Sequence, residues 1–174
     1  IHLDRIDDAL AIAISSKSVP GSARRQLALY AEKPFSIHLD GVSVIPFADD
    51  PLTDYLPGFA AEINGTPVVA HVDTGGSFLY MSPARAKALG IETFDAGKTR
   101  AHLDMTEFDY SAGIADRFKL GGATLMNVPV SVLPTLTGDS DLIIFGTCIL
   151  ERFLSTLDYP GRRLILSRRG RPDE

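Results

Sequence analysis

The stretch that decides the fold is residues 68–79, which read VVAHVDTGGSFL. An almost unbroken apolar run ends at the carboxylate of Asp73, and Thr74 and two glycines follow at once. The apolar run predicts a buried strand, and a carboxylate at the end of such a strand needs compensating hydrogen bonds. Glycines let backbone amides approach that carboxylate closely, and the Thr74 hydroxyl can tie neighbouring loops together. The pattern indicates a functional carboxylate, although it also fits an ordinary strand followed by a tight turn.

The sequence on both sides of this stretch predicts short strands separated by turns. Asn64-Gly65 is a strong hairpin signal between two apolar segments. Ser82, Pro83 and Gly90 have the positions expected of a cap, a first turn and a stop for a short helix. Other strands are expected at 35–39, 42–46, 100–104, 110–118, 123–133 and 142–145, with a short helix at 147–153 and a terminal hairpin at 155–167. The fold class predicted is mainly β with short helices.

The first part of the chain differs from the rest. Apolar residues between 3 and 14 follow a helical spacing, and Pro20-Gly21 interrupts it before a second helical segment. We therefore expect a helical N-terminal segment at residues 1–33 and one β-rich domain at residues 34–174.

Composition limits the possible functions. The chain has 174 residues, is 45% hydrophobic and carries a net charge of −5, which fits a globular protein and disfavours nucleic-acid binding. Cys148 is the only cysteine and the four histidines lack ligand spacing, so we expect no metal and no cofactor. No apolar run approaches the roughly 20 residues that cross a bilayer.

The beginning of the chain carries no secretion signal. It starts at Ile1, and its first residues are acidic, without a basic stretch and an apolar core. The expectation leans to an exported protein of the bacterial periplasm whose signal is absent from this chain.

These features together resemble the retropepsin-like aspartic proteases, in particular their single-domain bacterial members. Besides Asp73-Thr74-Gly75, three segments match in the expected order: the helix at 82–90, the strand pair at 118–130, and DLIIFG at 141–146. The resemblance spans about residues 58–167, and it implies a closed acid-protease barrel.

The resemblance also implies an endopeptidase mechanism with Asp73 as the catalytic residue. In this family two carboxylates share one proton; the ionised one activates a water, and the protonated one donates to the scissile carbonyl. No metal takes part. The resemblance implies a set of residues that support the catalytic loop: Thr74, Gly75, Gly76, Ser77 and Gly146.

The chain carries only half of such a dyad, because Asp73-Thr74-Gly75 is its only Asp-Thr/Ser-Gly triplet. We expect a homodimer that acts on polypeptides, with residues 159–167 as a possible interface. Two alternatives stay open: one lobe of a longer two-lobed protease, and an inactive peptidase-like binding or dimerisation module.

The residues of a substrate cleft are suggested by their positions. His71 lies two residues before Asp73, so both point to one face of the strand. The resemblance implies that His71 lines the substrate cleft, and the alternative is a histidine hydrogen-bonded in the core or at an interface. The resemblance implies a flap between residues 90 and 110, with its tip at Asp104, Met105 and Thr106. A hydrolase triad of Ser77, His71 and Asp73 is disfavoured, because the sequence lacks the second glycine of a nucleophile elbow.

Overall fold

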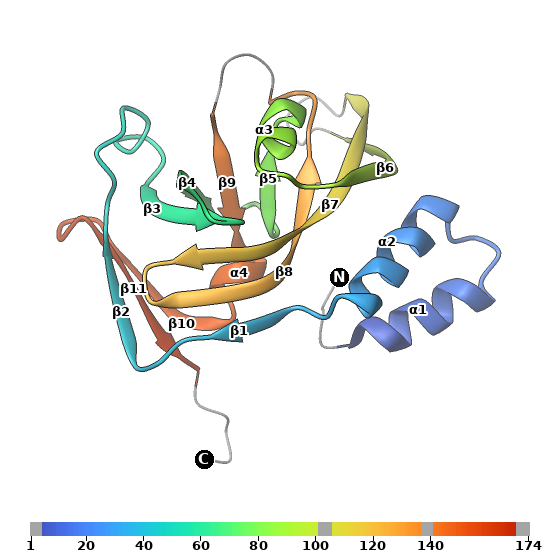
Figure 1. The fold of residues 1–174 in the computed structure, drawn as a ribbon, viewed down its shortest axis with the longest axis horizontal. Coiled ribbons are helices and arrows are strands. Elements are labelled where there is room, and N and C mark those ends of the chain that lie inside the picture. The colour runs from blue at the N-terminus through green and yellow to red at the C-terminus, as the bar shows by residue number, and fades with distance from the viewer. Residues whose placement is uncertain (1–4, 101–105, 137–140, 170–174) are drawn as a thin grey trace.

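The computed structural model describes residues 5–100, 106–136 and 141–169. Two helices come first, α1 (Ile6–Ser15) and α2 (Gly21–Glu32). The remaining elements, in chain order, are β1 (Ser36–His38), β2 (Val42–Pro46), β3 (Gly58–Ile63), β4 (Thr66–Asp73), β5 (Leu79–Met81), α3 (Pro83–Ala88), β6 (Thr93–Arg100), β7 (Glu107–Leu120), β8 (Ala123–Val132), β9 (Ile143–Gly146), α4 (Thr147–Leu150), β10 (Phe153–Asp158) and β11 (Arg163–Arg168). The prediction of a mainly β fold with a helical N-terminal segment is confirmed (Figure 1).

Most of the strands form one sheet that curls back on itself. Its order is β1-β8-β5-β9-β4-β3-β7-β6, and β7 also pairs with β8. This additional pairing joins the strands from β8 to β7 into a ring, whereas β1 and β6 extend beyond it. The closed barrel implied by the resemblance is thus a ring-like sheet with two outlying strands.

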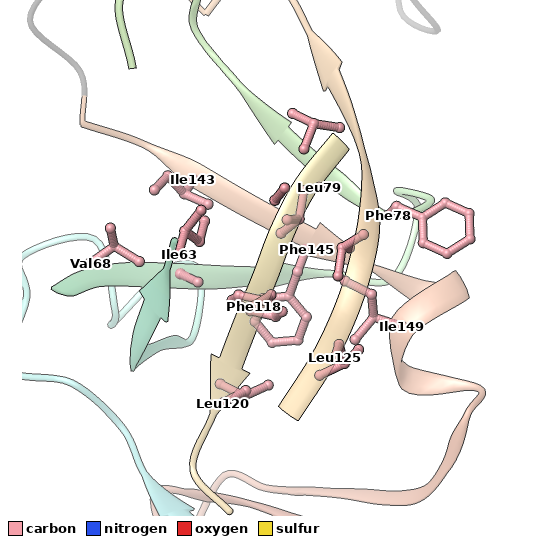
Figure 2. Close-up of a cluster of buried hydrophobic side chains, with 14 of the residues drawn as sticks. Ile63, Val68, Phe78, Leu79, Phe118, Leu120, Leu125, Ile143, Phe145 and Ile149 are labelled. Atoms are coloured by element: carbon pink, nitrogen blue, oxygen red, sulfur yellow. The ribbon is translucent and has the colours of Figure 1, made fainter. Parts of the chain in front are cut away.

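The inside of the ring is filled by aromatic and aliphatic side chains. Phe59, Phe118 and Phe145 are fully buried, and Phe145 lies 6.0 Å from Phe59 and 6.1 Å from Phe118 between ring centroids. Figure 2 shows Phe118 and Phe145 together in this core. Burial of each such side chain contributes about 1.5–3 kcal/mol. Since Phe145 immediately precedes Gly146, this packing fixes the end of β9.

Local turn chemistry explains the hairpin that leads to Asp73. Asn64 and Gly65 both have positive φ, 49° and 87°, as the type I′ turn requires. Their turn sets the antiparallel register of β3 and β4, in which Gly58 lies opposite His71. The short helix α3 also begins as predicted, because the Ser82 side chain accepts a hydrogen bond from the amide of Arg85.

A second, smaller sheet has the order β10-β11-β2. The terminal hairpin was predicted, but β2 also pairs with β11 along Arg163–Ser167. Both edges of β11 are therefore occupied. An interface at residues 159–167 cannot use the backbone of β11, and the outer edges of this sheet belong to β10 and β2.

The helical segment packs on the outside of β6 and β7. Figure 1 shows α1 and α2 beside these strands, on the far side of the molecule from β2, β10 and β11. Ile6, Ala13, Leu27 and Tyr30 form a separate small core with Ile114 of β7. The segment is thus attached to the β domain by an apolar contact.

The position of β6 differs from the prediction of a strand at residues 100–104. The strand runs from Thr93 to Arg100, and its pairing with β7 shifts register between Asp95 and Gly97. This irregularity breaks the apolar alternation by which a strand is recognised. Residues 101–104 lie outside the described part of the chain.

Within the described part, no helix combines the length and apolar character needed to span a membrane.

Candidate active site

Asp73 ends β4 and begins a tight loop. One carboxylate oxygen, Oδ1, accepts a hydrogen bond of 2.8 Å from the amide of Gly75. The amide of Gly76 donates to the backbone carbonyl of Asp73 at 3.0 Å. The strand is buried through Val72 as predicted, but Asp73 itself is exposed in the single chain. The carboxylate is therefore oriented by the loop and open to a partner or to solvent.

The loop is held from behind by the start of α4. The amide of Thr147 donates to the carbonyl of Gly76 at 2.9 Å, and the amide of Cys148 donates to the carbonyl of Ser77 at 3.0 Å. The Thr147 hydroxyl donates to the carbonyl of Thr74. These bonds fix the residues on both sides of Gly75 and leave little freedom for the Asp73 carboxylate.

Gly146 makes this close approach possible. It lies directly opposite Asp73 in the parallel pairing of β4 and β9. A Cβ atom at this position would overlap the backbone carbonyl of Gly76. The predicted role of Gly146, to make room behind the loop, has a direct steric basis here.

Cys148, the single cysteine of the sequence, follows Thr147 and contacts the loop that begins at Asp73. Burial and the carboxylate of Glu151 raise the pKa of Cys148 above its ordinary value. A thiol with a raised pKa is mostly protonated at neutral pH and is a poor nucleophile. Cys148 thus supports the loop through its backbone amide, and its half-buried side chain is a thiol of low reactivity.

A pocket of about 330 Å³ opens beside Asp73. Tyr80 of β5 and Ile144 of β9 line one wall. Thr99 and Phe108, which are cross-strand partners in β6 and β7, line another. The ends of β6 and β7 therefore share a pocket with the Asp73 loop, in the segment where the resemblance implies a flap. The full lining comprises Asp73, Gly75, Gly76, Tyr80, Thr99, Arg100, Phe108, Leu133, Thr135, Leu136 and Ile144.

The expected flap tip is only partly described. Asp104 and Met105 lie outside the described residues, and Thr106 is exposed just before β7. The assignment of these three residues to the cleft stays a prediction.

His71 does not line the pocket of Asp73. It is 2% exposed; its Nδ1 lies 2.8 Å from the carbonyl oxygen of Leu56, and its Nε2 lies 3.6 Å from Oδ1 of Asp50. It lines a separate pocket of about 500 Å³, with Asp50 and Arg85. The loop before β3 folds over His71, because the carbonyl of Pro57 accepts a hydrogen bond from the amide of Val72. His71 is thus a buried, hydrogen-bonded histidine beside a pocket other than that of Asp73, and its role in substrate binding stays a prediction.

Two residues of the site carried no signal that sequence reasoning used. Tyr80 lies outside the loop, in β5, and its hydroxyl accepts a hydrogen bond of 2.9 Å from the amide of Ser77. Thr147 follows Gly146 directly, and only its contact with Thr74 reveals its role. A metal is not indicated: across the described ranges, no three His, Cys, Asp or Glu side chains converge on one point.

The family model described as an aspartyl protease matches residues 59–148, which include the whole catalytic loop and the start of α4. The chain belongs to the aspartyl protease family.

The fold of this family member was compared with solved structures. A retropepsin-like aspartic protease from Rickettsia conorii is 22% identical, with a TM-score of 0.50 over 78% of this chain and 94% of that one. The retroviral protease-like domain of Ddi1 from Leishmania major is 18% identical, with a TM-score of 0.40 over 68% of this chain and 98% of that one. No curated protein sequence matches the chain significantly. The match to the Rickettsia structure confirms the predicted retropepsin-like fold.

Proposed function

We propose that this aspartyl protease is an endopeptidase whose dyad consists of Asp73 from each of two chains. The observation that carries the proposal is an oriented, exposed carboxylate on a glycine-backed loop beside a pocket of about 330 Å³. Among the described residues that line this pocket, Asp73 is the single carboxylate. A chain with one half of a dyad needs a second half from elsewhere.

The surface around Asp73 supports a second copy as the source. Leu56 and Pro57 contact His71 and Val72, the two residues that precede Asp73 in β4. In the loop that ends at Pro57, Leu52 is 47% exposed and Tyr55 is 89% exposed. Exposed large apolar side chains on a loop that leads to the end of β4 fit a face that a second chain covers, and a twofold axis close to Asp73 would bring the two Asp73 residues together.

In the assembled site one carboxylate would act as the general base and the other as the general acid. The ionised Asp73 takes a proton from a water, and the protonated Asp73 donates to the oxygen of the scissile carbonyl. The hydroxyl of Thr147 and the amide of Gly75 hold the loop while the proton moves. A peptide would lie extended in the pocket, beneath Thr99 and Phe108 of the β6–β7 hairpin. We assign this activity to residues 34–174 and treat residues 1–33 as an appended helical segment.

Cleavage of casein and of a peptide library, with and without pepstatin, tests the proposal. The wild-type protein should cleave, pepstatin should block cleavage, and Asp73→Asn should abolish it. Asp7→Asn, which makes the same change on an exposed residue of α1, is the matched control and should retain activity. Activity that survives in Asp73→Asn contradicts the dyad. A correctly folded wild-type dimer without activity identifies the chain as a binding module, and a strict monomer without activity favours a lobe of a longer protease.

A further inference from the structure

Tyr80 contacts the Asp73 loop from β5, a different element from α4. It lies in β5, where it pairs with Ser131 of β8 and with Ile144 of β9. A strand bonded on both sides is a rigid support. From this support the Tyr80 hydroxyl accepts a hydrogen bond of 2.9 Å from the amide of Ser77. The loop therefore depends on a side chain for this bond, whereas its bonds to α4 come mainly from backbone amides.

The aromatic ring of Tyr80 also occupies the space beside Gly76. A Cβ atom built on Gly76 would lie 3.0 Å from Cε2 of Tyr80 and 3.5 Å from Cδ2. Only glycine leaves the ring in its observed place without displacement. A methyl group at Gly76 would therefore press against the Tyr80 ring and require a small shift of it, whereas a methyl group at Gly146 would overlap backbone atoms.

From these contacts we infer that Tyr80 is a positioning residue for Asp73, acting through Gly76 and Ser77. Thr147 fixes the carbonyl of Gly76 on one side, and Tyr80 fixes the amide of Ser77 on the other. Gly76 in turn donates to the carbonyl of Asp73. Displacement of Ser77 is thereby transmitted to the Asp73 carboxylate, which must meet its counterpart within hydrogen-bonding distance. The inference rests on the proposed function of Asp73.

The chain offers a matched control for the loss of the Tyr80 hydroxyl. Tyr30 of α2 accepts a hydrogen bond of 2.9 Å from the side-chain amide of Gln26. Both hydroxyls accept one N–H bond of the same length, but Tyr30 lies in the small core with Ile114 and not in the pocket. Tyr80→Phe and Tyr30→Phe therefore remove the same chemical group, one beside the Asp73 loop and the other in the small helical core.

The first experiment compares steady-state kinetics of these two variants on one peptide. Tyr80→Phe keeps the ring that lines the pocket, so KM should stay within about twofold of wild type, while kcat falls about fivefold to tenfold. Tyr30→Phe should leave both constants unchanged. Equal kcat values for Tyr80→Phe and wild type, with only a lower melting temperature, overturn the inference and make Tyr80 merely structural.

The second experiment tests the shape of the Gly76–Tyr80 pair. Gly76→Ala should lower kcat at least fivefold in the wild-type background, because the new methyl group meets the Tyr80 ring. In a Tyr80→Leu background, where the ring is absent, the same change should cost less than about twofold. Equal costs in the two backgrounds contradict this steric contact.

A third measurement is independent of turnover. The amide of Ser77 should be protected from hydrogen exchange in wild type and in Tyr30→Phe, and it should exchange faster in Tyr80→Phe. Unchanged protection in Tyr80→Phe overturns the inference whether or not the protein is active. If Asp73→Asn is inactive but Tyr80→Phe is fully active, the proposed function stands and the inference fails. If Asp73→Asn remains active, both fail.

Discussion

Asp73 and Gly146 face each other across the parallel pairing of β4 and β9, at the point where both strands end. The pairing brings the catalytic loop and the start of α4 into backbone contact. The sheet and α4 therefore hold the loop in place, and the hydrogen bonds within the loop orient the Asp73 carboxylate.

Replacement of Gly146 by alanine should disable the site. The added methyl group overlaps the backbone carbonyl of Gly76 and approaches that of Ser77. Because backbone atoms cannot move aside as a flexible side chain can, we expect a loss of about 2–3 kcal/mol in the free energy of unfolding and a large loss of activity. Chemical denaturation measures the free energy of unfolding, and the peptide assay measures the activity. Gly21→Ala, at a helical position with open space around it, is the control. Full activity in Gly146→Ala contradicts the steric account.

The thiol of Cys148 should react slowly. Since burial and Glu151 raise its pKa, its thiolate fraction at pH 7–8 lies below that of a free cysteine, and it increases as the pH rises. We expect alkylation by iodoacetamide to be slower in the folded protein than in protein unfolded by urea, with a steeper increase above pH 8. Alkylation at the unfolded rate in the folded protein at pH 8 would show that the thiol is not perturbed.

Alkaline pH should loosen the helical segment. Burial raises the pKa of Tyr30 from its ordinary value of 10 to about 12 in the folded protein. A neutral Tyr30 thus stabilises the folded state fully below pH 10, and this stabilisation is lost as the pH rises from 10 to about 12. The loss should reach roughly 2–3 kcal/mol for two pKa units.

Unfolding of wild type and of Tyr30→Phe at pH 9 and at pH 11.5 measures this effect. The variant lacks the ionisable group, so its free energy of unfolding should fall less than that of wild type between pH 9 and pH 11.5. The advantage in free energy of unfolding that wild type has over the variant should therefore decrease. A difference that is the same at both pH values means that Tyr30 titrates like an exposed tyrosine.

Local signals were sufficient for much of the fold. Asn64-Gly65 predicts its turn because both residues tolerate positive φ, and Ser82 predicts the start of α3 because its hydroxyl caps the helix. The segments that match the family follow one another in a fixed order, which predicted the position of Asp73 at the end of a buried strand. These features depend on neighbours in the sequence.

The features that were missed depend on contacts between distant residues. The pairing of β2 with β11 joins residues 42–46 to residues 163–167 and has no local signature. For His71 the sequence left two interpretations open, and only the loop that ends at Pro57, distant from it in sequence, accounts for its burial. Tyr80 is a single residue without a motif, and only its distance to Ser77 identifies it as part of the site.

The most direct test of a shared dyad is to mix the wild-type protein with Asp73→Asn at a fixed total concentration and to measure the peptidase rate as a function of the wild-type fraction. If each active site needs one Asp73 from each of two freely exchanging chains, only wild-type pairs cleave. The rate should then fall with the square of that fraction, to about one quarter in an equal mixture. A rate that falls in direct proportion, to about one half in an equal mixture, would mean that each chain cleaves on its own and that no second Asp73 takes part.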